Sequence, residues 1–229
     1  MAESRPIKIW RDPYGEKFNT TSARSITFSK GLTILVGCNG IGKTTLLHNI
    51  EDVLKDQSIP VYKFSNRDDS QKMIDRASFN GDFTFMATMS ASSEGENTTI
   101  ILGKLLDKIK QFIKTGKNPD KRKFFRDDED EKEVTSTERW LLFDSVDSGY
   151  SIDNIIIIKK LFDRMIKDAE DNNIDLFIIV STNAYEFAND SKCIDVASGK
   201  KISFNSYDDY KKFILKTSEI KEKRFEKRE

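Results

Sequence analysis

The chain has 229 residues, of which 37% are hydrophobic and 33% charged, which is enough for one core and at most a small appended lobe. Its 38 basic residues balance its 38 acidic ones, so net charge provides no general attraction to nucleic acid and leaves only local patches. Cys38 and Cys193 fit neither a disulfide framework nor a metal-ligand spacing. The longest apolar runs are too short to span a membrane, and the first residues lack a signal-peptide core. We therefore expect a cytoplasmic protein without a membrane segment.

The first half of the chain predicts strands and helices around a glycine-rich segment. Strands are expected at residues 7–10, 25–28, 32–36 and 61–64. The run at 32–36 is continuously apolar, which is typical of a strand covered on both faces in a parallel sheet. It leads into the glycine-rich residues 37–45, and apolar residues then recur at helical spacing. Another helix is expected to enter at residues 92–96, where Ser93 and Glu96 have the spacing of a capping box.

The second half begins with residues 117–138, which are dominated by charge and predict an exposed insertion. Helices are expected at residues 152–171 and, as a charged amphipathic segment, over about 206–229. Strands are expected at residues 140–143, 176–180, 194–196 and 202–204, the last two as a hairpin. Strands that alternate with helices favour an α/β fold with a mixed sheet flanked by helices. We expect one domain over residues 1–229.

The glycine-rich segment reads Gly-Cys-Asn-Gly-Ile-Gly-Lys-Thr-Thr and matches the pattern G-x-x-x-x-G-K-T. In this pattern the glycines let backbone N–H groups cradle phosphates, while the following helix adds its dipole. Lys43 is expected to reach the outer phosphates and Thr44 to hold Mg²⁺. The predicted binding residues are Gly37, Asn39, Gly40, Gly42, Lys43, Thr44 and Thr45. The preceding strand and following helix favour a P-loop for ATP and Mg²⁺ over an ordinary glycine turn.

The strand at residues 140–143 ends in Asp144. A P-loop enzyme needs a carboxylate at this point because it orders the water shell of Mg²⁺. An apolar run that ends in aspartate is a weak signal by itself, but the glycine-rich segment upstream strengthens it. We expect Thr44 and Asp144 to form the metal site.

The order of these motifs resembles the head of an ABC-type ATPase, within the compact RecF/SMC-like branch that includes small stand-alone ATPases of phages and defence systems. The resemblance implies that residues 92–96 fill the family's signature motif, with Ser93 as its serine and Gly95 as its second glycine. Both would reach the γ-phosphate bound by a second subunit, although a plain capping box is the alternative. Ser148 would open the loop that crosses the dimer interface.

Two positions depart from the family pattern. The catalytic glutamate of the family falls on Ser145, whose hydroxyl is a poor general base near neutral pH, and Asp147 lies two residues further along. The family's γ-phosphate-sensing histidine falls on Asn183, which can hydrogen-bond a phosphate oxygen but cannot carry a proton. Both departures predict nucleotide binding with slow or partner-dependent hydrolysis. His48, the only histidine, is expected to be structural.

The resemblance also suggests less specific assignments. Gln71 is the candidate for the glutamine that contacts Mg²⁺ and the attacking water, and Phe18 or Tyr14 could stack on adenine. Ser93 lies 50 positions after Lys43, which leaves too little chain for a transporter's docking subdomain or for a coiled-coil arm. We therefore expect a reduced helical lobe. The charged residues 117–138 either contact a partner or DNA, or form a solvated loop.

Three functions follow from these patterns. The first is an ATP-dependent, head-to-tail homodimer that acts as a slow switch on an effector such as a nuclease, in DNA repair or phage defence. The second is a scaffold that binds ATP without hydrolysing it. The third is another P-loop NTPase or a kinase, which would leave unexplained the resemblance of residues 147–151 to the family's interface loop, the loop that Ser148 would open. Direct binding of nucleic acid is left open by the balanced charge.

Overall fold

The computed structural model describes residues 3–9, 21–65, 94–119, 134–148 and 150–226. The described strands are β1 (Ser4–Lys8), β2 (Ser25–Ser29), β3 (Gly31–Val36), β4 (Val61–Ser65), β5 (Glu138–Asp144), β6 (Asp175–Ser181), β7 (Lys192–Asp195) and β8 (Lys200–Ile202). The described helices are α1 (Lys43–Asp56), α4 (Glu94–Thr115), α5 (Ile152–Asp171), α6 (Tyr185–Ala188) and α7 (Tyr207–Glu226). The predicted mixed α/β architecture is confirmed.

The main sheet has six strands in the order β4-β5-β6-β3-β7-β8, and β1 pairs with β2 in a separate antiparallel ribbon. The first five strands run parallel, while β8 returns antiparallel to β7. The carboxyl ends of β5, β6 and β3 therefore meet at one edge, with β6 in the centre. Loops that follow these three strands are brought together there, although they are far apart in the sequence.

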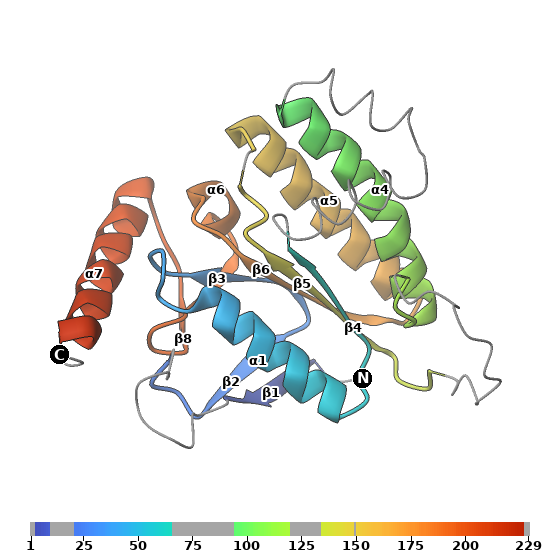
Figure 1. Ribbon diagram of the computed structural model, residues 1–229. Coiled ribbons are helices and arrows are strands. Elements are labelled where there is room, and N and C mark those ends of the chain that lie inside the picture. The colour runs from blue at the N-terminus through green and yellow to red at the C-terminus, as the bar shows by residue number, and fades with distance from the viewer. Residues whose placement is uncertain (1–2, 10–20, 66–93, 120–133, 149, 227–229) are drawn as a thin grey trace, which may run out of the picture.

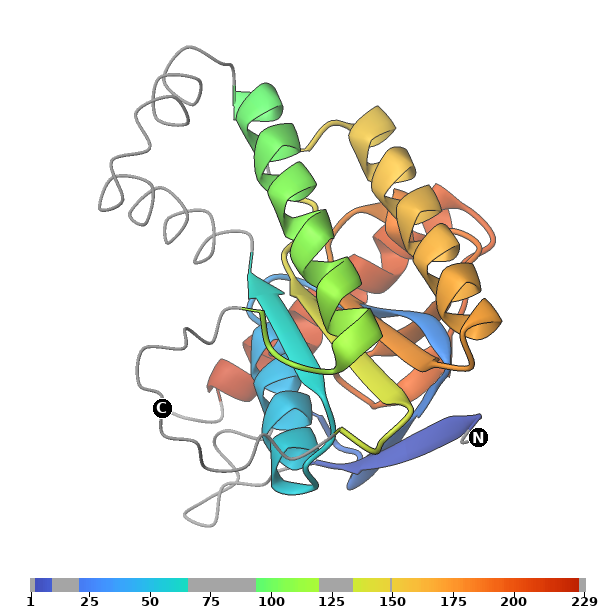
Figure 2. The ribbon, with the colours of Figure 1, turned by 90° about the vertical axis from the view of Figure 1, so that its right-hand side faces the viewer.

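Each face of the main sheet supports its own core because side chains alternate along a strand. On β5, Leu141 and Phe143 join a cluster with α4 and α5, whereas Trp140 and Leu142 join one with α1 and the β1–β2 ribbon. Figures 1 and 2 show α4 and α5 side by side over one face, with α1 across the other. This double covering explains why every residue of β5 and β6 is buried.

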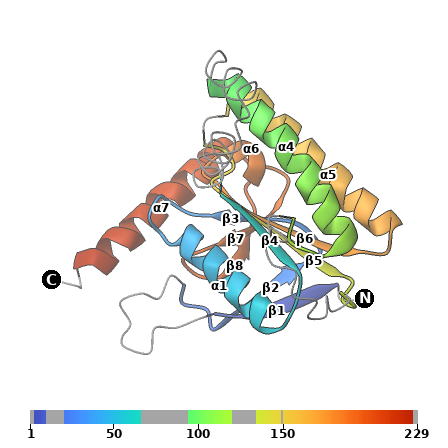
Figure 3. The same ribbon diagram turned by 45° about the vertical axis from the view of Figure 1, so that its right-hand side comes forward.

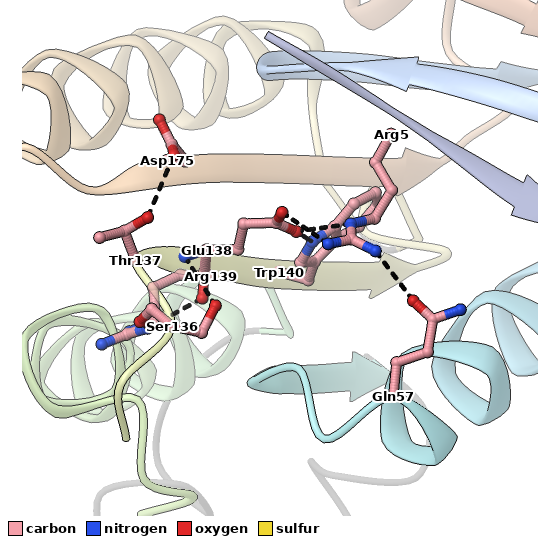
Figure 4. A network of polar contacts seen from close by, with 8 residues as sticks. All are labelled: Arg5, Gln57, Ser136, Thr137, Glu138, Arg139, Trp140 and Asp175. Carbon is pink, nitrogen blue, oxygen red and sulfur yellow. Dashed lines mark hydrogen bonds and ion pairs between the residues drawn. The ribbon is translucent and has the colours of Figure 1, made fainter. Parts of the chain in front are cut away.

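The β1–β2 ribbon is fastened to β5 by a polar network (Figure 4). Arg5 donates from Nε and Nη2 to the two carboxylate oxygens of Glu138, each at 2.7 Å, and from Nη1 to Gln57 at 2.8 Å. Trp140 Nε1 donates to the same carboxylate at 3.2 Å. The expected exposed insertion through residue 138 is thus wrong at its end. Glu138 begins β5 and is buried because Arg5 neutralises it.

The hairpin and the first strand lie earlier than predicted. β1 covers residues 4–8 instead of 7–10, and the hairpin β7–β8 begins two residues before the expected position. The reason is register: Cys193 pairs with Ile34 of β3, and Ile7 pairs with Ile26 of β2. Apolar pattern alone does not report these partners. The short α6 was not predicted, whereas α5 begins and ends where expected.

The last helix, α7, lies beside the end of β3 and close to α6 (Figure 3). Its charged amphipathic pattern is compatible either with packing on the sheet or with binding to a partner. Its residues Tyr210, Phe213, Ile214 and Ile220 pack against the two core clusters. Among the described helices, none is both long and apolar enough to cross a membrane.

Candidate functional site at the carboxyl edge of the sheet

The glycine-rich loop, residues 37–42, joins β3 to α1 through conformations that require glycine. Gly37 has φ of 147°, and a Cβ there would lie 2.9 Å from Ile41 Cγ2. Gly42 has φ of 111° and is the N-cap of α1. A side chain at either position would strain the backbone, and at Gly37 it would also collide with Ile41. The glycine spacing noted in the sequence therefore has a conformational cause.

The N-terminus of α1 presents backbone donors that have no acceptor within the helix. Gly42 supplies no side-chain cap, and the first turn contains no acidic residue. The first N–H groups of a helix have no intrahelical acceptor, and the helix dipole adds a partial positive charge at this end. The amides of Lys43, Thr44 and Thr45 occupy this turn. Such a helix end favours an anion.

Lys43 points back over the loop, and its hydrogen-bond acceptors among the described residues are neutral. Its Nζ donates to the carbonyls of Gly37 at 2.7 Å and Cys38 at 3.1 Å, and to Asn183 Oδ1 at 2.8 Å. Within the described part of the chain, Lys43 forms no ion pair. Burial lowers the pKa of Lys43, a shift that nearby groups, including Asp147 and Asp144, oppose. A bound anion would give this ammonium group a charged partner and stabilise its protonated form.

Asp144, at the end of β5, offers a metal ligand. Its Oδ1 accepts from Ser181 Oγ at 2.6 Å and from Thr44 Oγ1 at 3.2 Å. The residue is only 7% exposed, and its Oδ2 has no hydrogen-bond partner in the described ranges. A hydroxyl beside a carboxylate with an unused oxygen fits a hard cation.

The described residues contain no cluster of three or more His, Cys, Asp or Glu side chains that could hold a metal. A cation at Thr44 and Asp144 would thus need water or phosphate oxygens as further ligands. Mg²⁺ is bound in this manner, by one or two carboxylates together with substrate phosphates. The residues present therefore fit Mg²⁺ that arrives with a phosphorylated ligand.

The chain turns sharply after Asp144. Ser145 has φ of 54°, which is uncommon for a residue other than glycine. Its N–H donates to Ser181 Oγ at 3.0 Å, and its carbonyl accepts from the Ser148 N–H at 3.1 Å. This turn returns the Asp147 carboxylate to the Asn183 N–H, 2.9 Å away. The loops after β5 and β6 are thereby tied together.

The structure brings several predicted site residues together at this edge. Gly37, Gly42, Lys43, Thr44, Asp144 and Asn183 are linked by the loop and by the hydrogen bonds above. The exposed positions around them are Asn39, Gly40, Thr45, Ser145 and Ser148. His48 lies on the exposed face of α1, 3.0 Å from Lys63 Nζ.

The structure gives less for the remaining predicted positions. Gly95 is the second residue of α4, which begins at Glu94 as the capping-box pattern predicted. Ser93, Gln71, Phe18 and Tyr14 lie outside the described residues.

Sequence reasoning missed four residues that surround the loop: Ser181, Tyr210, Thr217 and Lys221. Ser181 orients Asp144, and the other three come from α7. One pattern in the sequence could have identified the α7 residues. Positions 210, 214, 217 and 221 recur at helical spacing, so a threonine and a lysine share a stripe with apolar residues.

No protein-family model matches this chain, and no curated protein matches it either.

Proposed function

We propose that this chain is an ABC-type ATPase head that binds ATP with Mg²⁺ at the glycine-rich loop. The observation that carries the proposal is the convergence of Lys43, Thr44 and Asp144 at the carboxyl edge of a parallel sheet. The Thr44 hydroxyl lies 3.2 Å from Asp144, and Lys43 has no carboxylate partner among the described residues. Open α/β sheets bind ligands at this edge, where the loops diverge.

Each group has a distinct role in this proposal. The backbone donors of the loop and of the first turn of α1 hold the phosphates. Lys43 exchanges its neutral acceptors for phosphate oxygens, which strengthens its hydrogen bonds because the new partners are charged. Thr44 and Asp144 hold Mg²⁺, which, when bound, neutralises phosphate charge. Ser181 fixes the Asp144 carboxylate by its 2.6 Å hydrogen bond.

Hydrolysis is proposed to be slow or to need a partner. Ser145 offers only a hydroxyl where the related heads have a glutamate, and it is exposed after a strained turn. The Asp147 carboxylate accepts a hydrogen bond from the Asn183 N–H, which holds it against the loop after β6 and away from the position that the glutamate would occupy in such heads. The same observation favours a second function, a scaffold that binds ATP and turns over nothing. Turnover in saturating Mg²⁺-ATP separates the two.

Dimerisation around ATP is part of the proposal. The resemblance assigns Ser93, Gly95 and Ser148 of one subunit to the phosphates held by the other. Ser148 is exposed, and Ile152 and Ile157, just beyond it on α5, are 60% and 59% exposed. A second copy that contacts Ser148 would cover this apolar surface. An effector such as a nuclease is added only by analogy with the fold.

The proposal is tested by light scattering of the full chain with and without Mg²⁺-ATP, alongside direct ATP titration. We expect ATP to bind and the mass to double, and Lys43→Ala to lose both effects. Binding without a change in mass would overturn the homodimer and leave the nucleotide site. Absence of ATP binding by the wild-type chain would overturn the proposed function altogether.

A further inference from the structure

Helix α7 makes contacts that its packing on the sheet does not explain. Its apolar residues Phe213, Ile214 and Ile220 account for its attachment to the core clusters. Three polar residues on the same helix instead contact the glycine-rich loop and Asn183. Surface helices ordinarily direct such polar groups to solvent. These polar contacts therefore have a role other than the attachment of α7 to the core.

Thr217 is a buried polar residue whose hydroxyl both accepts and donates a hydrogen bond. It is 1% exposed, accepts from the Cys38 N–H at 3.0 Å and donates to the Ile214 carbonyl at 2.8 Å. Cys38 is the second residue of the glycine-rich loop. The hydrogen bond gives this amide a partner outside the loop and fixes the path of the backbone between Gly37 and Asn39. Loss of the hydroxyl would leave a buried N–H without an acceptor.

Lys221 extends from the next turn of α7 across the loop. Its Nζ donates to the Asn39 carbonyl at 3.3 Å, and a Cβ placed on Gly40 would lie 3.6 Å from its Cδ. Among the described residues Lys221 forms no ion pair. The loop is thus bordered by two ammonium groups, Lys43 from α1 and Lys221 from α7, and neither is neutralised by a described carboxylate.

The same helix contacts Asn183. Tyr210 is 4% exposed, and its hydroxyl donates to the Asn183 carbonyl at 2.9 Å. The side chain of Asn183 in turn accepts from Lys43. A cavity of about 250 Å³ lies between α7 and the loop, with Cys38, Asn39 and Asn183 on one side and Tyr207, Lys211 and Leu215 on the other. A ligand that extends beyond the loop on this side would meet α7.

We propose that α7 completes the phosphate site, with Lys221 as a second phosphate-binding cation and Thr217 as the positioning residue of the loop. This inference rests on the proposed nucleotide site and adds a cation from the C-terminal helix that the loop motif does not contain. Lys221 lies over the outer edge of the loop at Asn39 and Gly40, so its attraction should grow with the charge of the phosphate chain. ATP should therefore depend on it more than ADP does.

The first test compares Lys221→Met with Lys223→Met, an exposed residue on the same helix that loses the same charge. Affinities for Mg²⁺-ATP and ADP are measured by calorimetric titration at two salt concentrations. We expect Lys221→Met to weaken ATP binding roughly three- to tenfold, with a smaller effect on ADP and a weaker salt dependence. Lys223→Met should stay within about twofold of the wild type. Equal effects of the two substitutions would overturn the role of Lys221.

The second test uses Thr217→Val and Thr217→Ser. Valine keeps the shape but removes the hydroxyl, so we expect both ATP and ADP to bind about tenfold more weakly, whereas serine restores affinity. Thermal unfolding is followed in parallel, because a purely structural role would lower the melting temperature of Thr217→Val without changing the affinity of the folded protein. That result would overturn the positioning role.

The two levels of the proposal fail in different ways. If wild-type protein binds no nucleotide, the proposed function and this inference both fall. If wild type binds ATP and Lys43→Ala does not, but the α7 variants bind like wild type, only the role of α7 falls.

Discussion

Removal of the Arg5 side chain should weaken the attachment of the β1–β2 ribbon to the main sheet. Arg5 makes a two-pronged ion pair with Glu138, whose side chain is 9% exposed, while the Arg5 side chain is 28% exposed. Breaking a buried ion pair by removal of one partner costs about 3–5 kcal/mol. Because Arg5 is partly solvated and Trp140 still donates to Glu138, we reduce this to about 2–3 kcal/mol for Arg5→Met.

A double-mutant cycle isolates the charge interaction. Glu138→Gln keeps an oxygen acceptor for Trp140 and Arg5 but removes the buried charge, and should cost about 1 kcal/mol. In that background Arg5→Met no longer leaves a buried carboxylate without its ion-pair partner, so it should cost only about 1 kcal/mol. The coupling energy is then about 1–2 kcal/mol, well above the deviation from additivity that independent sites show. Urea unfolding followed by two probes provides these free energies, provided that the transition is two-state.

The matched control is Lys8→Met, which removes a charge from an exposed position of the same strand. It should change the free energy of unfolding by less than about 0.5 kcal/mol. The reasoning is refuted if Arg5→Met costs no more than Lys8→Met, or if the effects of Arg5→Met and Glu138→Gln add without coupling. Either result would mean that the ribbon is held by its apolar contacts alone.

Three further predictions concern the site and the sheet. Ser145→Glu should raise ATP turnover at least about tenfold, measured as phosphate release in saturating Mg²⁺-ATP, and no gain would count against the account of slow hydrolysis. ATP affinity should fall on the alkaline side at a pH below the ordinary lysine pKa, because burial lowers the pKa of Lys43 and phosphate binds its charged form; Lys43→Arg should flatten this pH dependence, and an unchanged profile would contradict it. Burial alone would raise the pKa of Asp175, but the hydrogen bonds that its carboxylate accepts from Lys30 and Thr137 outweigh this effect and lower the pKa. Asp175 therefore adds stability above its unfolded pKa, and this stability disappears as pH falls through the lower folded value. Lys30→Met should reduce the free energy of unfolding at neutral pH and make it less dependent on acid, as measured by urea titrations at neutral pH and at a pH below the folded pKa of Asp175. A loss of stability that is equal at these two pH values would argue against the ion pair.

Much of the fold was accessible from local pattern. The helix at 152–171, the strand that begins near Leu32 and the helix that starts after Ser93 were predicted because apolar period and capping residues act over a few residues. The loop between β3 and α1 was recognised for the same reason, since its glycines are required by local backbone angles. The proximity of Thr44 and Asp144 was expected from the motif order, and their hydroxyl and carboxylate lie 3.2 Å apart.

Other features depended on contacts across the chain. The hairpin was placed two residues late because its register is determined by Cys193 opposite Ile34, a pairing that no local pattern records. Glu138 was assigned to an exposed segment because its partner, Arg5, lies 133 residues away.

The amino-acid sequence by itself determined the succession of strands and helices and the glycine-rich loop, because these depend on side chains only a few positions apart. The tertiary structure alone decided that α7 borders this loop, since Thr217 lies 179 residues from Cys38, and Lys221 lies 182 from Asn39. It also turned Asp147 toward Asn183 through the strained Ser145. Such contacts form only when the sheet brings distant loops to one edge, where the geometry of the whole fold determines which polar groups meet.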